Sequence, residues 1–246
     1  SKKQVIHQAN QFAARCVQNR IFDDIIFRSQ QQSEDCLYLN IWSKADNKNA
    51  PVYVYFHGGG FAVGSGDEAR YDGEAFAKQG IVFVSVNYRL GVFGFLSHPE
   101  LSKETNYKGS GNYGLYDQQA AIQWVKNNIK QFGGNPEHIV LGGESAGSIS
   151  VSAQMLTSLN KNLLKGVTAQ SGSMLGLDFS SRSLADGESE GVALQQSLGL
   201  INFKQMRFIP AEQLLKQATE KRFVWFRPVV DGNFFTDDPH KLYMQG

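Results

Sequence analysis

The chain is poor in cysteine and proline, contains no long apolar run and carries almost no net charge. Its 246 residues include two cysteines and six prolines, which argues against a disulfide-rich scaffold and against a proline-rich disordered segment. No apolar run approaches the roughly 18–20 residues of a membrane-spanning helix, so stable membrane insertion is not expected. Lys and Arg number 24 against 23 Asp and Glu, a formal net charge of +1. This balance indicates neither nucleic acid nor an anionic membrane as a partner.

The residues that are present indicate one globular unit. Hydrophobic residues make up 41% and charged residues 19%, which is typical of a soluble globular protein. A chain of this length can bury a large core as a single domain. The histidines show no spacing typical of metal ligands, and we expect neither a metal ion nor another cofactor.

The two cysteines, Cys16 and Cys36, bracket a polar loop that contains three consecutive glutamines. Two interpretations stay open from the spacing alone: a disulfide, or two unrelated buried thiols. A disulfide across a loop of this length would add roughly 3 kcal/mol in the chain-entropy model, and it would require an oxidising compartment.

Strand-like apolar runs alternate with segments of helical periodicity. We expect strands at residues 36–42, 52–57, 81–88, 139–143 and 166–170. Apolar residues at three- and four-residue spacing predict a helix over 117–132, and a second helix is expected from the serine at 145 to about residue 156. Later helices are expected at 194–201 and 210–219, with a surface loop at 180–190. The pattern predicts an α/β fold with a mostly parallel sheet flanked by helices.

The GESAG stretch at residues 143–147 follows an apolar run and leads into a helical segment, with Ser145 at the apex of the turn. Glycines two before and two after the serine allow the strand and helix to approach closely. The expected result is a nucleophile elbow, which exposes the serine hydroxyl near a helix N-terminus that favours negative charge. A chance match is the alternative, because the chain contains 25 glycines.

A second motif, HGGGF at residues 57–61, also follows a strand-like run. Its bare backbone N–H groups suit the anionic oxygen of an acyl-transfer intermediate, together with the N–H of the residue after the nucleophile. A phosphate-binding loop is the rival, but residues 58–66 contain neither GxGxxG nor GxxxxGK[ST], and no lysine lies there.

An ordered series of motifs resembles the type-B carboxylesterases, the cholinesterase-like group of α/β-hydrolases. The motifs are SEDCLYLNIW at 33–42, HGGGF at 57–61, NYR at 87–89, FGFL at 93–96, GNYGLYDQ at 111–118, FGGNP at 132–136, GESAGS at 143–148, QSG at 170–172 and RPVVDG at 227–232. The hormone-sensitive-lipase-like esterases share HGGG, but they favour GDSAGG and lack the EDCLYLN block. We rank that group second.

The resemblance implies roles for residues that match the family motifs. Ser145 corresponds to the nucleophile, and Gly59, Gly60 and Ala146 correspond to the oxyanion hole. The remaining residues are expected to support the structure or the site: a Cys16–Cys36 disulfide, an Arg89–Asp117 ion pair, Glu144 and Ser171.

Two of these expectations keep their alternatives. Glu144 either favours a charged imidazolium or makes a structural hydrogen bond to buried water or backbone. The stretch that corresponds to the acyl side of the cholinesterase gorge, Phe223, Val224, Trp225 and Phe226, is either pocket lining or plain core. Within it we name Val224 and Phe226 as possible pocket residues, and we add Phe61.

The pattern breaks after RPVVDG. Triad chemistry needs a base and an acid, which in this fold follow the serine, yet the chain has only fourteen residues after Gly232. Four histidines precede Ser145, and His240 lies in a stretch that matches a surface turn. We therefore expect residues 1–246 to be part of the catalytic domain of an esterase about twice this length, with a loop region at 1–36 and the sheet core at 37–246.

The expected function is hydrolysis of a small-molecule carboxylic ester through an acyl-enzyme, with the C-terminal half of the same protein as the necessary partner. The isolated segment is expected to be inactive. A catalytically silent adhesion or binding module is the alternative, but silent relatives usually lose the serine that this chain keeps. The expected disulfide implies an extracellular or periplasmic location.

Overall fold

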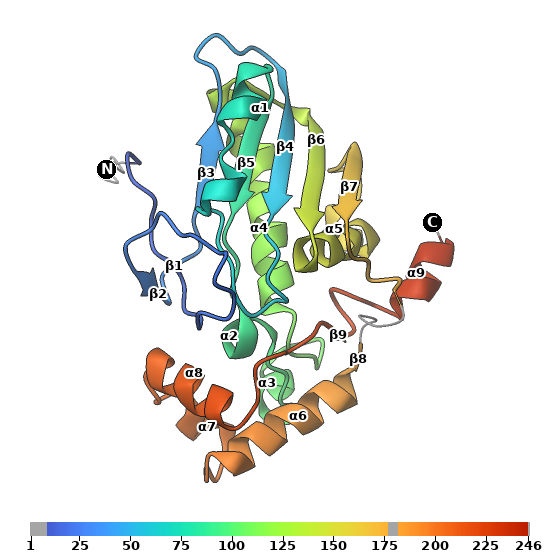
Figure 1. The fold of residues 1–246 in the computed structure, drawn as a ribbon. Coiled ribbons are helices and arrows are strands. Elements are labelled where there is room, and N and C mark those ends of the chain that lie inside the picture. The colour runs from blue at the N-terminus through green and yellow to red at the C-terminus, as the bar shows by residue number, and fades with distance from the viewer. Residues whose placement is uncertain (1–8, 177–181, 246) are drawn as a thin grey trace, which may run out of the picture.

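A five-stranded sheet forms the centre of the molecule, and the computed structural model describes residues 9–176 and 182–245 (Figure 1). The strands, in spatial order, are β3 (Leu39–Trp42), β5 (Val82–Val86), β4 (Ala50–Phe56), β6 (Gly134–Glu144) and β7 (Gly166–Gln170). Only β3 runs antiparallel to its neighbour within this sheet. The prediction of an α/β fold with a mostly parallel sheet is confirmed.

The other elements surround this sheet. The helices are α1 (Glu74–Lys78), α2 (Gly91–Phe95), α3 (Pro99–Glu104), α4 (Tyr113–Asn128), α5 (Ala146–Leu156), α6 (Leu184–Ser197), α7 (Phe203–Met206), α8 (Ala211–Glu220) and α9 (Pro239–Gln245). Short 3-10 turns are η1 (Ala69–Tyr71), η2 (Ile129–Phe132) and η3 (Ser158–Asn160). Two small parallel pairs, β1 (Arg15–Cys16) with β2 (Gln32–Ser33) and β8 (Arg182–Ser183) with β9 (Val229–Val230), complete the described elements.

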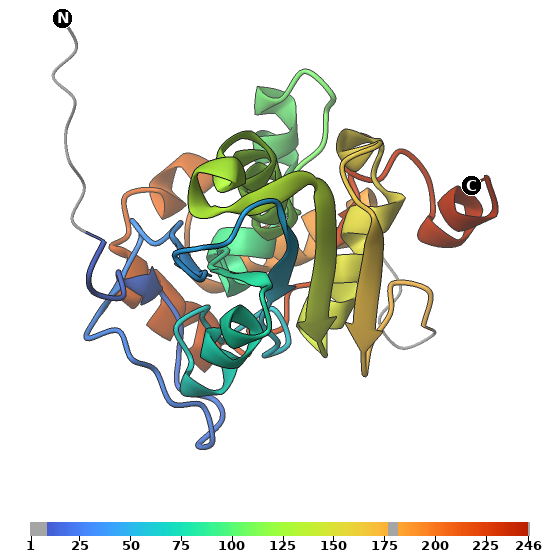
Figure 2. The same cartoon turned by 90° about the horizontal axis from the view of Figure 1, so that it is seen from above.

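The two faces of the sheet differ in chemistry because successive side chains of a strand point to opposite sides. On one face Tyr53 and Phe83 pack against Phe76 of α1, with ring centroids 5.4 and 4.9 Å away. On the other face aliphatic side chains of β4 and β5 join a core with α4 and α5. Figure 2 shows α1 on one side of the sheet and α4 and α5 on the other. Helices on both faces explain why β5 is buried along its whole length.

The parallel strands bring their carboxyl ends together at one edge. Phe56 pairs with both Val86 and Gly143, so the residues that follow β4, β5 and β6 lie side by side. Helices α3, α6, α7 and α8 lie beyond this edge (Figure 1). Ligands of parallel α/β sheets bind outside the carboxyl ends of the strands, so this is the edge where the motifs should meet.

All five predicted strands are confirmed: β7 has the predicted bounds, and the other four have shifted ends. β6 is the most changed, because it begins five residues earlier than expected. The predicted helix at 117–132 is α4 followed by η2, and it begins earlier, at Tyr113. Its start is set by tertiary contacts: Asn112 adopts a left-handed conformation, and its side chain bonds both the N–H and the C=O of Val229. The predicted helix at 210–219 is α8.

The surface loop predicted at 180–190 is wrong from Leu184 onward, where α6 begins; residues 180 and 181 lie outside the described ones. The helix ends at Ser197, so the one expected at 194–201 is its last turn. Two buried glycines, Gly187 and Gly191, make this helix hard to recognise in the sequence. A methyl group on Gly187 would lie 2.7 Å from Val229, and one on Gly191 would lie 1.9 Å from the backbone of Ser97. Because α6 buries glycine here, its apolar periodicity is weak.

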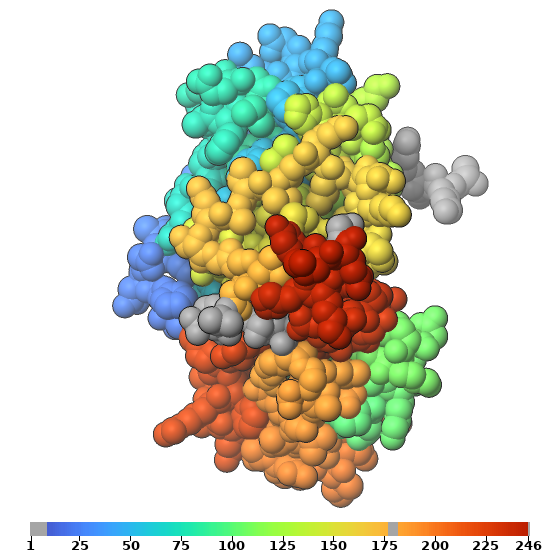
Figure 3. All heavy atoms as spheres, turned by 90° about the vertical axis from the view of Figure 1, so that its right-hand side faces the viewer, coloured from blue at the N-terminus to red at the C-terminus, as the bar shows by residue number. Residues whose placement is uncertain are grey.

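The space-filling view in Figure 3 shows α9 (red) against the segment that holds α5 and β7 (yellow), with α6 (orange) below it. None of the helices in the described part of the chain has the length and apolar character needed to cross a bilayer.

Candidate active site

The chain turns sharply at Ser145, between the end of β6 and the start of α5. Its backbone has φ 57° and ψ −121°, which non-glycine residues rarely adopt, so packing must hold it there. A methyl group on Gly143 would lie 2.4 Å from the backbone of Gly147, and one on Gly147 would lie 2.0 Å from the carbonyl oxygen of Phe56. The close approach that the spacing of the glycines predicts is therefore present.

The glycine loop, residues 58–64, leaves β4 and passes directly beside this turn. A methyl group on Gly58 would lie 2.9 Å from the carbonyl oxygen of Glu144 and 3.3 Å from Cβ of Ser145. The two motifs, far apart in sequence, are thus in contact at the carboxyl edge of the sheet.

Backbone N–H groups of the loop and of α5 are free to bind a ligand. Gly59 and Gly60 have φ of 106° and 63°, a region that favours glycine. The carbonyl oxygen of Gly59 accepts hydrogen bonds of 3.1 Å from the N–H groups of Ala62 and Val63, which makes the loop a compact turn. Within the described residues the N–H groups of Gly59, Gly60 and Ala146 donate to no acceptor.

The segment after β7 closes the other side of the turn. The carbonyl oxygen of Gln170 accepts a 2.9 Å hydrogen bond from the N–H of Ser145. A methyl group on Gly172 would lie 2.6 Å from the carbonyl oxygen of Ser145, and the hydroxyl of Ser148 donates to the Gly172 carbonyl at 2.6 Å. Ser171 is exposed, with a positive φ of 58°. It borders the turn without bonding to it.

Glu144 is exposed, and its carboxylate lies beside the glycine loop. Oε2 would be 3.0 Å from a methyl group on Gly58. Within the described residues this carboxylate makes no hydrogen bond to the backbone. Burial raises the pKa of the nearby Tyr71 to about 12, and the charges of Glu68 and Glu144 act in the same direction. Tyr71 is therefore a neutral neighbour of the site.

His57 supports the loop from behind. Its ring stacks on Tyr88 with centroids 4.3 Å apart, and Nδ1 donates to the carbonyl oxygen of Gly58 at 2.8 Å. Burial lowers the pKa of His57 to about 4, so the ring is neutral at physiological pH. It makes no hydrogen bond to Ser145. His7 lies outside the described residues.

The other histidines are occupied elsewhere or distant. His98 is buried and bonds a glutamine of α6 at 2.8 Å. His138 is exposed in β6, seven strand residues before Ser145, or roughly 23 Å at the usual rise. His240 places Nε2 at 3.2 Å from the carbonyl oxygen of Leu175. No described histidine is bonded to Ser145.

Among the predicted pocket residues, Phe61 and Phe226 lie in the core, 3% and 2% exposed. Val224 is half-buried. The side chain of this stretch that covers the glycine loop is Trp225, which is 49% exposed and whose ring would lie 2.6 Å from a methyl group on Gly60. The sequence offered one signal for it, an aromatic residue in a stretch that aligns with a gorge wall, but it did not separate this side chain from its neighbours.

Comparison with known proteins gives a consistent result. The family model described as "Carboxylesterase family" matches residues 2–246. The chain belongs to the carboxylesterase family. It is 37% identical to mouse (Mus musculus) cholinesterase over 268 residues, covering 98% of this chain and 42% of the relative. It is also 36% identical to para-nitrobenzyl esterase of Bacillus subtilis, covering 88% and 45%, and 42% identical to fumonisin B1 esterase of Sphingopyxis macrogoltabida, covering 74% and 34%.

Solved structures of this carboxylesterase family superpose on the chain. A PNB esterase matches with a TM-score of 0.81 and 34% identity, over 95% of this chain and 49% of its own. A carboxylesterase of Geobacillus stearothermophilus matches with a TM-score of 0.79 and 40% identity, over 87% and 47%. These matches confirm the predicted α/β-hydrolase fold. The chain spans between a third and a half of the length of these relatives.

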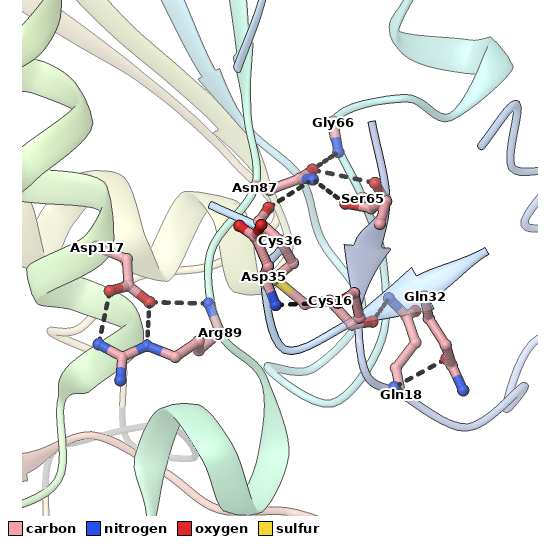
Figure 4. Close-up of a disulfide and its surroundings, with 12 residues drawn as sticks. Cys16, Gln18, Gln32, Asp35, Cys36, Ser65, Gly66, Asn87, Arg89 and Asp117 are labelled. Carbon is pink, nitrogen blue, oxygen red and sulfur yellow. Dashed lines mark hydrogen bonds and ion pairs between the residues drawn. A yellow bond between two sulfur atoms is a disulfide. The ribbon is translucent and has the colours of Figure 1, made fainter. Parts of the chain in front are cut away.

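Arg89 and Asp117 are in contact, as the family resemblance implies (Figure 4). Asp117 is 8% exposed, and its carboxylate accepts three hydrogen bonds from Arg89, at 3.0 Å from the backbone N–H, 2.8 Å from Nε and 2.7 Å from Nη2. These bonds, chief among them the side-chain pairing, raise the pKa of the Arg89 guanidinium above its usual range. The pair ties the segment after β5 to α4.

Replacing Asp117 with asparagine should therefore lower the free energy of unfolding by about 1–3 kcal/mol, the range for hydrogen bonds to charged groups, and leave kcat and KM unchanged. Urea unfolding of the complete protein measures the first quantity. Glu74→Gln is the matched control, because its ion pair with Lys78 is about two-thirds exposed, and solvent screening should leave it a much smaller contribution to stability. Equal stability of the two variants would show that the buried pair is dispensable.

Cys16 and Cys36 are joined by a disulfide, and both are buried. The pairing implied by the family resemblance is confirmed. Within residues 9–176 and 182–245, no cluster of three or more His, Cys, Asp or Glu side chains is arranged to hold a metal ion.

Proposed function

We propose that the complete protein is a serine hydrolase of carboxylic esters, with Ser145 as the nucleophile. The observation that carries this proposal is the meeting of the Ser145 turn with the free N–H groups of Gly59, Gly60 and Ala146 at one edge of the sheet. A hydroxyl beside preorganised N–H donors is the arrangement that acyl transfer requires. Relatives that are named esterases support an ester as substrate.

The reaction proceeds in two halves. Oγ of Ser145 attacks the ester carbonyl carbon and gives its proton to a general base, while the carbonyl oxygen becomes an anion held by the three N–H groups. The carbon–oxygen bond to the alcohol then breaks, the alcohol leaves with the proton, and the acyl group stays on Ser145. Water then gives a proton to the same base and attacks the acyl carbon. The bond from that carbon to Oγ breaks, Oγ takes the proton back from the base, and the carboxylic acid leaves.

The base and its orienting acid are proposed to lie beyond residue 246. No described histidine bonds Ser145, and the described imidazoles are engaged with other partners or distant from the turn. The C-terminal part of the protein is thus the partner that completes residues 1–246, which form part of one catalytic domain. Glu144, exposed beside the serine, is proposed to favour the charged imidazolium, with Ser171 bordering the same space.

A fluorophosphonate probe tests this proposal. In the complete protein it should label one residue stoichiometrically, and peptide mapping by mass spectrometry should locate the label at Ser145. A catalytically silent binding module would not be labelled. Labelling of residues 1–246 alone should be slower by a factor of about 10²–10⁴, the usual contribution of general-base catalysis.

We further propose that the protein works in an extracellular or periplasmic compartment, because the Cys16–Cys36 bond needs an oxidising environment to persist. In protein isolated from its native compartment without reductant, Cys16 and Cys36 should carry no free thiol under denaturing conditions. Alkylation with iodoacetamide followed by peptide mapping by mass spectrometry reads both positions. Alkylated Cys16 and Cys36 would contradict both the bond in vivo and the location.

A further inference from the structure

The loop closed by the disulfide, residues 16–36, contacts the glycine loop through the buried side chain of Gln18; we call it the disulfide loop. Its amide makes two hydrogen bonds to the backbone of a single residue, Gly64, 46 positions away in sequence. Oε1 accepts from the Gly64 N–H at 2.7 Å, and Nε2 donates to the Gly64 carbonyl oxygen at 2.9 Å. Nε2 also donates to the carbonyl oxygen of Cys16 at 3.0 Å. Gln18 is 6% exposed, so these bonds are shielded from water.

Gly64 in turn holds the start of the glycine loop. Its φ of 116° requires glycine, and a methyl group there would lie 2.2 Å from Nδ1 of His57 and 2.6 Å from the carbonyl oxygen of Gly58. Between these ends, Gly59 approaches Val63 so closely that a methyl group would lie 2.1 Å from its carbonyl oxygen. The loop is a closed turn, and fixing its last residue fixes the orientation of the N–H groups at its apex.

The disulfide loop is itself attached to the sheet, as Figure 4 shows. The side chain of Asn87, at the end of β5, donates to the carbonyl oxygen of Cys36 at 3.1 Å and accepts from the N–H of Gly66 at 2.8 Å. The N–H of Gln18 donates to the side chain of Gln32 at 3.2 Å. Gln18 is therefore fixed in a loop that the disulfide and these hydrogen bonds hold against the sheet, and its amide in turn fixes the position of Gly64.

From this geometry we propose that Gln18 is a positioning residue for the oxyanion donors. It keeps the N–H groups of Gly59 and Gly60 aimed at the developing negative charge, and it acts through Gly64 without touching substrate. The inference rests on the proposed function, since it assigns a role in the same site. A misplacement of about 1 Å in catalytic groups costs roughly 10²-fold in rate. Loss of the two hydrogen bonds between Gln18 and Gly64, which we call the clamp, should therefore act mainly on kcat.

The test uses the complete protein with Gln18→Met, which keeps the length of the side chain and removes both hydrogen bonds to Gly64 and the one to Cys16. We expect kcat for an aryl ester to fall about 10- to 100-fold, with KM changed less than about threefold, because the donors act chiefly on the transition state. Hydrogen–deuterium exchange of the peptide that contains residues 58–66 should become faster. Gln30→Ala, an exposed glutamine of the same disulfide loop, is the matched control and should change neither quantity.

Gln18→Glu separates the clamp from simple packing. The carboxylate still accepts from the Gly64 N–H but has no donor for the Gly64 carbonyl, so kcat should again fall, and this variant serves if Gln18→Met does not fold. Unchanged kcat in a folded variant, or a loss confined to KM, overturns the proposal. If exchange accelerates as expected but Ser145→Ala still hydrolyses esters, the clamp stands and the proposed function fails.

Discussion

Replacing Ser145 with alanine in the complete protein should lower ester hydrolysis by roughly 10⁴- to 10⁶-fold. The nucleophile, its base and the N–H donors act as one unit, so removing the hydroxyl leaves only the stabilisation that binding and the donors provide. KM for a short aryl ester should change little, since Ser145 is half-buried at a turn held by backbone contacts that alanine keeps. Release of p-nitrophenol from p-nitrophenyl acetate measures the loss, and the same variant should resist the fluorophosphonate probe.

Ser158→Ala is the matched control for this substitution. Ser158 is exposed in η3, beyond the far end of α5, and its hydroxyl makes no hydrogen bond within the described residues. Activity of this variant should equal that of the unmodified protein. Hydrolysis by Ser145→Ala at more than about a tenth of the normal rate would show that another residue is the nucleophile.

Replacing Gly147 with alanine should be the most damaging small change to the fold around the site. The new methyl group would lie 2.0 Å from the carbonyl oxygen of Phe56 and 2.9 Å from that of His57, and a backbone carbonyl at the end of a central strand cannot move aside. Overpacking typically costs about 1–3 kcal/mol, and a contact this short between backbone and Cβ should cost at least about 3 kcal/mol. Activity should fall as well, because α5 and the glycine loop must separate.

Gly166→Ala makes the same chemical change at a site that has room for it. A methyl group on Gly166, at the start of β7, would meet nothing within 4 Å. Alanine is also slightly favoured over glycine in a strand, so stability should stay the same or rise by up to about 1 kcal/mol. Thermal unfolding of both variants, read alongside kcat, provides the comparison. Similar stability for the two would mean that α5 does not pack on β4 as closely as described.

The serine turn and the glycine loop could be predicted from sequence because their backbone requirements are local. Glycine is the residue that fits the close contacts at Gly143 and Gly147 and the positive φ of Gly59 and Gly60. The positions of the glycines in the sequence therefore indicate the backbone geometry of both segments. The parallel strands were also predictable, since burial on both faces produces continuous apolar runs.

Other features depend on contacts that no local pattern reports. Helix α6 packs Gly187 against the side chain of Val229 and Gly191 against the backbone of Ser97, so its first half resembles a polar loop in the sequence. The clamp between Gln18 and Gly64 pairs a polar residue of an irregular loop with a backbone 46 positions away, and nothing in the periodicity of either segment signals it. The position of Trp225 over Gly60 is of the same kind.

The strand order of the sheet imposes a delay while the chain is being synthesised. β4 ends at Phe56 and pairs early with β5 on one side, but its other neighbour, β6, ends only at Glu144. At translation rates of roughly 5–20 residues per second, the second edge of β4 stays uncovered for several seconds. An open apolar strand edge is a template for pairing with other chains. The nascent polypeptide therefore passes through a period of exposure to aggregation, and to chaperones, that ends only when β6 pairs with β4.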